Sequence, residues 1–284
     1  MNADARQLLP AGASALAALG WRDGHLDART EVLPDEVPVA LAYNGISHAV
    51  MLASPTDLED FALGFSLSER IVRHPRDVYD IEIERADDGI VVAMRVAAGA
   101  LARLKESRRA RTGLTGCGLC GVESLRRFGD DTADVAPCRA LPAPAAAAPL
   151  QPAALQRAMA QLAARQHLHH ATGGTHAAGW AAPDGTLRCL REDVGRHNAL
   201  DKLVGALARG DMLAQGGFAV VTSRASYEMV QKAARAGFGL LAAVSAPTAL
   251  AVSLAERAGV TLAGFVRGDR YVLYTHPQRL VGAA

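Results

Sequence analysis

The chain of 284 residues contains few aromatic side chains, has almost no net charge and lacks a long unbroken apolar run. Phe, Trp and Tyr make up 5% of the residues, which argues against a surface on which nucleic-acid bases stack. The 30 Lys and Arg residues nearly balance the 29 Asp and Glu residues, so the net charge of +1 provides no general attraction for nucleic acid. Apolar runs such as 237–251 are broken by Ser, Pro and Thr and do not reach the roughly 20 apolar residues of a membrane helix. We therefore expect neither nucleic acid nor a membrane as a partner.

Cysteine is also scarce, and its four residues are too few for a disulfide-stapled fold in a chain of this length. The first residues are rich in Ala and Leu, but Asp4 precedes Arg6 and Pro10 interrupts the segment, so a secretory signal is not expected. Hydrophobic residues make up 50% and charged residues 21%, the composition of a globular protein. These features predict a cytoplasmic protein whose cysteines serve redox, metal or sulfur chemistry.

The first part of the chain is interpreted as a leader followed by a small α+β subdomain. Residues 1–28 show no clear periodicity and are expected to be disordered. Asn44-Gly45 between apolar runs is the strongest short-range signal of a β-hairpin, and Ser54 or Thr56 can cap the helix that follows. The strands and helices predicted here are 37–43, 46–52, 58–65, 81–85, 90–96 and 101–111. Residues 29–112 are therefore expected to form the α+β subdomain.

The remainder of the chain, 113–284, predicts an α/β domain. Its Pro- and Ala-rich stretch 139–153 is expected to be a loop. The predicted strands are 174–181, 186–191, 217–222, 239–245, 260–265 and 271–275, and the predicted helices are 154–167, 198–209, 227–236 and 248–258. Apolar strands that alternate with short helices indicate a sheet with helices on its faces.

The sequence Gly116-Cys117-Gly118-Leu119-Cys120-Gly121 is the first candidate for chemistry. Its glycines make the backbone mobile, which suits cysteines that must reach from one partner to another. Cations lie just upstream and would stabilise a thiolate or persulfide anion: Lys105, Arg108, Arg109 and Arg111. Half of a zinc site is an alternative, although no second CxxC or HxxxH completes it. Cys138 and Cys189 lack both features and are expected to be dispensable.

Three further candidate segments carry polar side chains at the ends of predicted strands. The first contains Asp193, Arg196, His197 and Asn198 before a helix. The second contains Thr222, Ser223, Arg224 and Ser226, also before a helix. Polar groups at strand-to-helix junctions are typical of ligand crevices in α/β sheets, and a helix N-terminus with an Arg favours an anion. The alternative in both cases is ordinary helix capping.

The third segment is the turn between the last two strands. It consists of Phe265, Val266, Arg267, Gly268, Asp269 and Arg270. Two arginines around a glycine can clamp a pyrophosphate, whereas the alternative is a plain surface turn. Gly173-Gly174-Thr175-His176 is a further possible ligand loop, with a packed histidine as its alternative.

Taken together and in this order, these motifs resemble those of the FdhD family, the formate dehydrogenase accessory sulfurtransferases. The resemblance covers about residue 30 to the C-terminus. The matching segments are Glu36-Val37-Pro38, Asn44-Gly45, 58–65, 116–121, 173–176, 192–199, Ser223-Arg224, Glu228-Met229-Val230, 245–249 and 264–270. The CxxC alone would be a weak signal, but the ordered set is specific.

The resemblance implies a cytidine-deaminase-like α/β/α domain without the zinc chemistry, preceded by the smaller α+β subdomain. It implies that Cys117 carries a persulfide with Cys120 as its partner, and that Phe265 to Arg270 contact the cofactor. The cargo would be the Mo-bis(molybdopterin guanine dinucleotide) cofactor, or its tungsten form, and no metal would be held by the protein itself. The absence of an H-x-E motif ahead of a CxxC agrees with the loss of deaminase activity.

The implied partners are a cysteine desulfurase as sulfur donor and the formate dehydrogenase catalytic subunit as client. A homodimer is also expected, because a second subunit can shield a persulfide during transfer and two-fold symmetry is the commonest arrangement. Two other function classes remain open: a chaperone that binds the cofactor or client with a passive CxxC, and a zinc-dependent hydrolase of deaminase type. Replacing Cys117 separates the first of these from sulfur transfer, and metal analysis separates the second.

Overall fold

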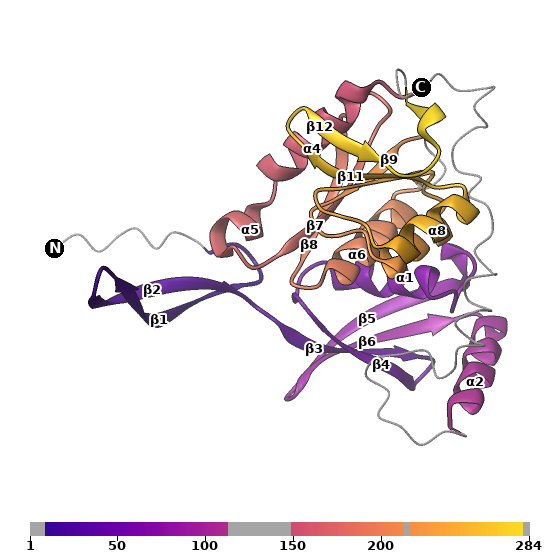
Figure 1. Cartoon of the computed structure of the whole chain (residues 1–284). Helices are drawn as coiled ribbons and strands as arrows, with labels where there is room; N and C mark the ends of the chain where they lie inside the picture. Colours follow the sequence, from indigo (N-terminus) through magenta and orange to yellow (C-terminus); the bar gives the residue numbers. More distant parts are fainter. Residues whose placement is uncertain (1–8, 113–148, 213–215, 281–284) are drawn as a thin grey trace.

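The computed structural model describes residues 9–112, 149–212 and 216–280, which contain three β-sheets (Figure 1). A two-stranded ribbon comes first, followed by a four-stranded sheet and then a six-stranded sheet. Helices separate the two larger sheets, so the molecule is built in layers.

The ribbon consists of β1 (Ala13–Arg22) and β2 (His25–Pro34), which pair antiparallel along their whole length. Asp23 and Gly24 connect the strands, and their φ values of 49° and 89° give the doubly left-handed turn that matches the twist of a hairpin. The expectation of a disordered leader over 1–28 is therefore wrong for residues 13–28, while residues 1–8 lie outside the described part. Asp23-Gly24 is the sequence signal of this hairpin. The many alanines of β1 hide the alternation of apolar and polar residues that would have indicated a strand.

The four-stranded sheet confirms the predicted hairpin and the α+β character of this part of the chain. Its strands are β3 (Val37–Tyr43), β4 (Ile46–Ala53), β5 (Val78–Ala86) and β6 (Gly89–Val96), in the order β4-β3-β6-β5. Helices α1 (Leu58–Ser68) and α2 (Ala98–Thr112) and the short 3₁₀ helix η1 (Pro75–Asp77) complete it. One sheet face packs on α1 through buried side chains such as Tyr43 and Phe61. Neither Ser54 nor Thr56 caps α1, because the helix begins after Asp57, which is left-handed.

The six-stranded sheet confirms the predicted α/β class. Its strands are β7 (His176–Ala181), β8 (Leu187–Asp193), β9 (Phe218–Val221), β10 (Leu240–Ala243), β11 (Thr261–Arg267) and β12 (Arg270–Leu273). Their order is β12-β11-β10-β9-β7-β8, with β9, β10 and β11 parallel and the remaining pairs antiparallel. A sheet with helices on both faces is compatible with the expected deaminase-like arrangement.

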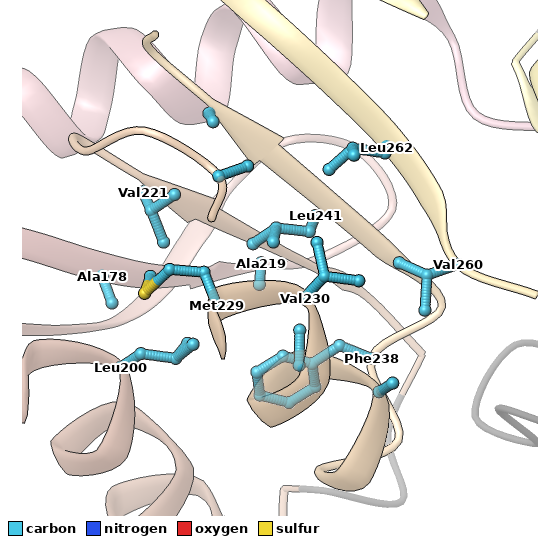
Figure 2. Close-up of a cluster of buried hydrophobic side chains, with 14 of the residues drawn as sticks. Ala178, Leu200, Ala219, Val221, Met229, Val230, Phe238, Leu241, Val260 and Leu262 are labelled. Carbon is cyan, nitrogen blue, oxygen red and sulfur yellow. The ribbon is translucent and has the colours of Figure 1, made fainter. Parts of the chain in front are cut away.

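Among the described residues, one face of this sheet packs on three helices and the other face on one. The three are α6 (Arg196–Arg209), α7 (Tyr227–Arg235) and α8 (Ala249–Ala258), and the other face carries α4 (Pro152–Ala164). Two short helices, α5 (His167–Thr172) and η2 (Pro277–Arg279), lie beside the sheet. Figure 2 shows the core on the three-helix side, where strand residues such as Val221 and Leu241 meet Met229 and Phe238. Burying these side chains is the main source of stability for the domain.

Helix α1 packs on the four-stranded sheet and also on α6, and so joins the two larger sheets. Gly64 and Gly205 stand where α1 and α6 cross. A Cβ atom on Gly64 would lie 1.7 Å from the carbonyl oxygen of Asp201, and one on Gly205 would lie 1.9 Å from that of Asp60. Only glycine permits this backbone approach, which explains why the helical segment around Gly64 carries one.

Candidate functional site

The predicted residues Asp193 and Asn198 lie inside the protein, in a cluster that we call the inner seam: Ser54, Asp193, Asn198 and Lys202. Lys202 Nζ lies 2.7 Å from Asp193 Oδ2, and both side chains are 0% exposed. The amide of Ser54 donates to Asp193 Oδ2 at 3.0 Å, and Asn198 Nδ2 donates to Asp193 Oδ1 at 3.1 Å. Ser54 Oγ in turn accepts from the amide of Val194 at 3.1 Å.

The inner seam fastens the end of β4 to the junction of β8 and α6. Asn198 Nδ2 also donates to the carbonyl of Leu52 at 2.8 Å, and Lys202 Nζ donates to that of Ser54 at 3.0 Å. Asp193 and Asn198 are 0% and 4% exposed, so their polar atoms serve internal contacts rather than face a ligand. Both residues therefore make internal contacts, but they do not cap α6, which begins after Gly195 without a side-chain capping bond. Their contact with a ligand stays a prediction.

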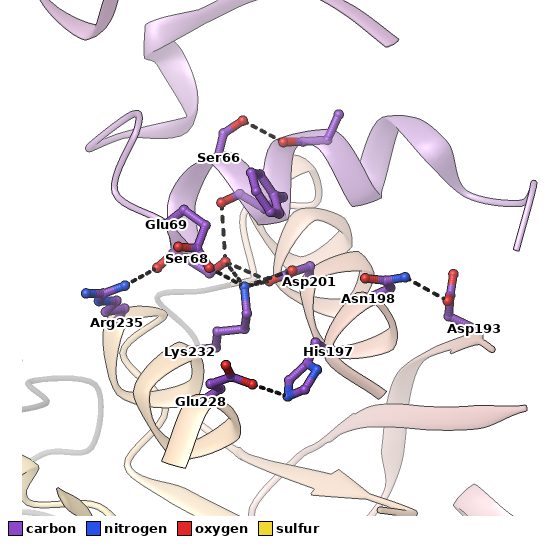
Figure 3. Close-up of polar contacts among 12 residues, drawn as sticks. Ser66, Ser68, Glu69, Asp193, His197, Asn198, Asp201, Glu228, Lys232 and Arg235 are labelled. Carbon is purple, nitrogen blue, oxygen red and sulfur yellow. Dashed lines mark hydrogen bonds and ion pairs between the residues drawn. The ribbon is translucent and has the colours of Figure 1, made fainter. Parts of the chain in front are cut away.

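A second buried cluster joins α1, α6 and α7 (Figure 3). Lys232 Nζ lies 2.9 Å from Asp201 Oδ2 and 2.7 Å from Glu69 Oε1, and it donates to Ser68 Oγ at 3.0 Å. Burial disfavours the charged form of Lys232, but Asp201 and Glu69 outweigh it and raise the pKa of the amine. Burial likewise opposes ionisation of Glu69, yet Lys232 lowers the pKa of that carboxyl. The pair of Glu69 and Lys232 is therefore ionised at neutral pH. Burial raises the pKa of Asp201, and the contact of Asp201 with Lys232 brings α6 into the cluster as the third helix.

Arg196 and His197 begin α6 and are partly exposed, unlike Asp193 and Asn198. His197 Nε2 lies 2.8 Å from Glu228 Oε2 on α7, and this close contact lowers the pKa of Glu228 (Figure 3). Arg196 Nε is buried and has no hydrogen-bond partner among the described residues. Burial, with Arg196 nearby, lowers the pKa of His176 at the start of β7, so this imidazole is neutral at pH 7. These groups form a partly buried polar cluster at one end of the sheet.

The segment after β9 turns along the same end of the sheet. Thr222 Oγ1 accepts from the amide of Ala177 at 2.9 Å, and Ser223 is buried with its hydroxyl donating to the carbonyl of Arg224 at 3.0 Å. Ser226 precedes α7, but its buried Oγ neither caps the helix nor has another partner in the described chain. Arg224 is exposed. Thr222 and Ser223 thus hold the loop in place and Arg224 faces solvent.

The turn Phe265 to Arg270 contains an irregular stretch of β11. The register of β11 with β12 shifts between Gly264 and Arg267, and Phe265 has a left-handed φ of 53° while its side chain is 44% exposed. Bulges of this kind occur next to functional sites, where they redirect side chains. An open hollow of about 910 Å³ lies here, lined by Phe265, Arg267, Asp269, Arg270, Tyr271, Val272, Leu273 and Pro277.

A second cavity, of about 520 Å³, opens under the loop Gly173 to His176. Its walls include the apolar side chains Met159 and Leu162 of α4, and its rim includes His176, Thr222 and Val244. Arg267 Nε donates to the carbonyl of Val244 at 3.0 Å, which connects this cavity to the turn. Glu228 lies in a matching segment of the resemblance but was not predicted as a site residue. The α4 wall is missing from the predicted site because nothing in its spacing relates it to the loop that it faces.

The carboxyl ends of β9, β10 and β11 thus bring two predicted segments to one edge, which we call the outer rim: Thr222 to Ser226 and Phe265 to Arg270. This edge is where α/β sheets bind ligands. The predicted Cys117 and Cys120 lie outside the described residues, as does most of the loop 139–153. Burial raises the pKa of the Cys189 thiol, which agrees with its expected lack of reactivity. In the ranges that the structure describes, no three His, Cys, Asp or Glu side chains are placed to hold a metal ion.

Comparison with known proteins shows which family the chain belongs to. The model of the FdhD/NarQ family matches residues 34–281, which include the seam, the CxxC and the outer rim. The chain belongs to the FdhD/NarQ family. The FdhD sulfur carrier protein of Cupriavidus necator is 56% identical over 268 residues, 94% of this chain and 90% of the relative. That of Bordetella bronchiseptica is 55% identical over 261 residues, 91% of each chain.

A solved structure shows the same fold. The crystal structure of a protein provisionally assigned as a formate dehydrogenase accessory protein in Desulfotalea psychrophila has a TM-score of 0.73. It covers 95% of this chain and 99% of its own, with 22% identity. Among the described residues, no helix is long and apolar enough to cross a membrane.

Proposed function

We propose that this protein is a sulfur carrier that accepts sulfur as a persulfide on Cys117 and passes it to the molybdenum or tungsten bis-pterin guanine dinucleotide cofactor of formate dehydrogenase. Membership of the FdhD/NarQ family carries the proposal, because the matched range 34–281 contains both cysteines and the outer rim. Relatives that are named sulfur carrier proteins share 50–56% of their residues with this chain over most of its length. In this role the protein is an enzyme, a sulfurtransferase.

The first step is thiol–persulfide exchange. The thiolate of Cys117 attacks the outer sulfur of a persulfide on the cysteine desulfurase, and the desulfurase cysteine leaves as a thiolate. The S–S bond of the donor breaks while a new one forms on Cys117, so the exchange involves no net oxidation. Cys120 holds or resolves the persulfide. The support for these roles is the sequence, with glycines on both sides of Cys117 and cations upstream.

The second step places the cofactor at the outer rim. Arg267 and Arg270 flank an open hollow of about 910 Å³, which suits a ligand with a pyrophosphate and a large pterin. Arg196, His197 and Arg224 add cationic and hydrogen-bonding groups at the same end of the sheet. The cofactor is cargo, and when bound it would supply the metal centre that takes up the sulfur as sulfide. The sulfide is released when the thiolate of Cys120 attacks the inner sulfur of Cys117, and an external dithiol then reduces the resulting Cys117–Cys120 disulfide. The residues of this chain bind the phosphates of the cofactor and orient the cofactor.

Three partners complete the proposal. A cysteine desulfurase donates the sulfur, and the formate dehydrogenase catalytic subunit receives the finished cofactor. A second copy of this chain forms a homodimer, which shields the persulfide during transfer. The reaction takes place in the cytoplasm.

The deciding experiment compares Cys117→Ser with Cys189→Ala in cells that depend on this protein for formate dehydrogenase activity. We expect Cys117→Ser to abolish the activity and Cys189→Ala to leave it intact, because the buried Cys189 thiol has a raised pKa. Full activity of Cys117→Ser would show that the CxxC is passive and that the protein acts as a chaperone.

Two measurements on the purified protein test the steps separately. Incubation with a cysteine desulfurase and cysteine should add the mass of one sulfur atom, and a reductant should remove it. Calorimetry with GDP should detect binding, because GDP carries the guanine and pyrophosphate of the cofactor. A protein that takes up sulfur without binding GDP at millimolar concentration would refute the proposed cofactor site only.

A further inference from the structure

The cavity under the loop Gly173 to His176, which we call the loop cavity, is lined by polar side chains that differ in how they are used. His169 Nδ1 donates to the carbonyl of Thr175 at 2.9 Å, since a carbonyl can only accept. The hydroxyl of Thr175 donates to Glu192 Oε1 at 3.2 Å. Thr222 Oγ1 accepts from the amide of Ala177 at 2.9 Å. These polar groups are therefore occupied by contacts within the protein.

Two other polar side chains of the lining remain: Gln166 and His176. Gln166 stands between α4 and α5 (Figure 1), is only 5% exposed, and makes no side-chain hydrogen bond to any described residue. Its amide is not among the unpartnered atoms that are sealed off completely, so its accessible part faces the loop cavity. The imidazole of His176 is partly buried and likewise has no partner within the described ranges.

A buried amide without a partner is unusual, because it has lost water and gained no hydrogen bond in return. An amide also offers a donor and an acceptor side by side, Nε2–H and Oε1. The group that satisfies Gln166 in one contact is therefore a ligand edge with an acceptor next to a donor. A lactam, in which a ring carbonyl adjoins a ring N–H, has this pattern.

The other walls of the loop cavity fit the flat face of such a ring. Met159, Leu162 and Ala163 come from α4, and Val244 follows β10. A thioether such as that of Met159 makes favourable contacts with aromatic rings. The volume of about 520 Å³ is that of a small-molecule site, and apolar walls with a few polar groups are typical of such sites. The lining therefore indicates a heterocycle rather than a charged group.

The loop cavity adjoins the open hollow of the outer rim. Val244 lines the loop cavity, and its carbonyl accepts from Arg267 Nε at 3.0 Å, while Arg267 lines the hollow. A pyrophosphate bound at Arg267 therefore has the loop cavity beside it. In the proposed cargo, the pyrophosphate carries guanosine on one side and a pterin on the other. Guanine and pterin both have a lactam edge.

We propose that the loop cavity binds a heterocycle of the cargo by its lactam edge, with Gln166 Nε2 donating to the ring carbonyl and Gln166 Oε1 accepting from the ring N–H. The inference rests on the proposed function for the identity of the cargo. It assigns the ring to Gln166 and leaves the phosphates to the arginines of the outer rim. Guanine and pterin share the edge, and the experiment decides which of them enters.

The test measures binding of GDP and of free pterin to the full chain by calorimetry. Gln166→Leu removes the amide and keeps a side chain of similar size. We expect it to raise the Kd of one of the two probes at least about tenfold, because a hydrogen-bonded edge is lost. A loss for GDP assigns the cavity to guanine, and a loss for pterin assigns it to the pterin. Arg267→Ala should weaken GDP but not pterin, which has no phosphate.

The outcomes separate this inference from the proposed function. If Gln166→Leu binds GDP and pterin as the wild type does, the inference is wrong and the cofactor site at the outer rim stands. If the wild type binds neither probe at millimolar concentration, the cofactor site itself is refuted, and the inference with it.

Thermal unfolding shows whether Gln166 instead has a structural role. Because Gln166→Leu removes a buried amide without a partner, the unfolding midpoint should stay the same or rise. The matched control is Gln231→Leu on α7, where a glutamine that is 8% exposed donates from Nε2 to the hydroxyl of Tyr227 at 3.2 Å. This variant should lose stability and bind both probes normally. A lower midpoint for Gln166→Leu, or an equal loss of binding in Gln231→Leu, would overturn the proposal.

Discussion

The inner seam and the outer rim hold similar polar side chains in opposite ways. In the seam, Asp193 and Lys202 are fully buried and contact each other, Ser54 and Asn198. At the rim, Arg224 is exposed, and Arg267 and Arg270 line an open hollow. Both regions follow a strand, yet the inner seam joins two parts of the fold and the outer rim is open to solvent. The difference shows that a polar strand end becomes a structural joint where a second element covers it and stays open to solvent where none does.

The largest expected effect comes from breaking the buried ion pair of the seam. Lys202→Met leaves Asp193 charged and unpaired in the interior, so we expect the free energy of unfolding to fall by about 3–5 kcal/mol. Urea unfolding, monitored by circular dichroism, measures this loss of stability.

The matched control for this prediction is the double variant Lys202→Met with Asp193→Leu, which removes both charges. It should recover part of the loss, because the interior then holds no uncompensated charge. A loss below about 1 kcal/mol for Lys202→Met alone would show that the seam is not a structural joint.

The second effect tests the close approach of α1 and α6 at Gly64 and Gly205. Gly64→Ala puts a Cβ atom 1.7 Å from the carbonyl of Asp201, so α1 and α6 must separate. Overpacking of this kind lowers the free energy of unfolding by about 1–3 kcal/mol or more. Gly99→Ala on α2 is the control, because its nearest neighbour is the flexible end of Arg103 at 3.7 Å. Thermal unfolding should separate the two variants, and equal midpoints would contradict the prediction.

A smaller effect depends on pH and concerns the ion pair of Glu69 with Lys232. Lys232 outweighs the burial of Glu69 and lowers the pKa of its carboxyl below the ordinary 4.5, so the pair stabilises the fold above pH 4.5. As the pH falls through the lowered pKa, protonation removes this contribution. Glu69→Gln should therefore reduce stability at pH 7, by less than about 1 kcal/mol because the carboxyl is partly exposed. Wild type and variant should converge in acid, and a gap that widens there would contradict the assignment.

The smallest effect on stability is expected at the rim, where the effect on binding should be large. Arg267→Ala should change the free energy of unfolding by less than about 0.5 kcal/mol, as is usual for an exposed side chain. Its affinity for GDP should fall at least about tenfold, because a charge-assisted contact to phosphate is lost. Arg257→Ala, an exposed arginine on α8, is the control and should bind GDP normally. Unchanged GDP affinity in Arg267→Ala would exclude this residue from the site.

Local signals predicted most of the helices and strands. Asn44-Gly45 marked the first hairpin of the α+β part, and the alternation of apolar strands with helices gave the α/β class. The Asp23-Gly24 hairpin was missed because alanines carry little β-sheet preference and hide which face is apolar.

The candidate site was predicted less completely, for a different reason. Asp193 and Arg267 both follow strand residues, and nothing local tells which of them is covered. The partners of Asp193 lie at Ser54 and Lys202, and the contact to Ser54 spans 139 positions of sequence. Contacts of such length depend on the packing of whole elements, which residue spacing does not report.

The contact between Lys202 and Ser54 spans 148 residues, and this has a consequence for synthesis on the ribosome. At about 5–20 residues per second, roughly 7–30 s pass between the emergence of the two residues. During that interval the face of α1 that later meets α6 has no partner, and Asp60, Gly64 and Ser68 stay uncovered. Variants that weaken the seam should therefore lower the soluble yield in cells more than the stability of the purified protein suggests, because incomplete chains spend this time without the contact.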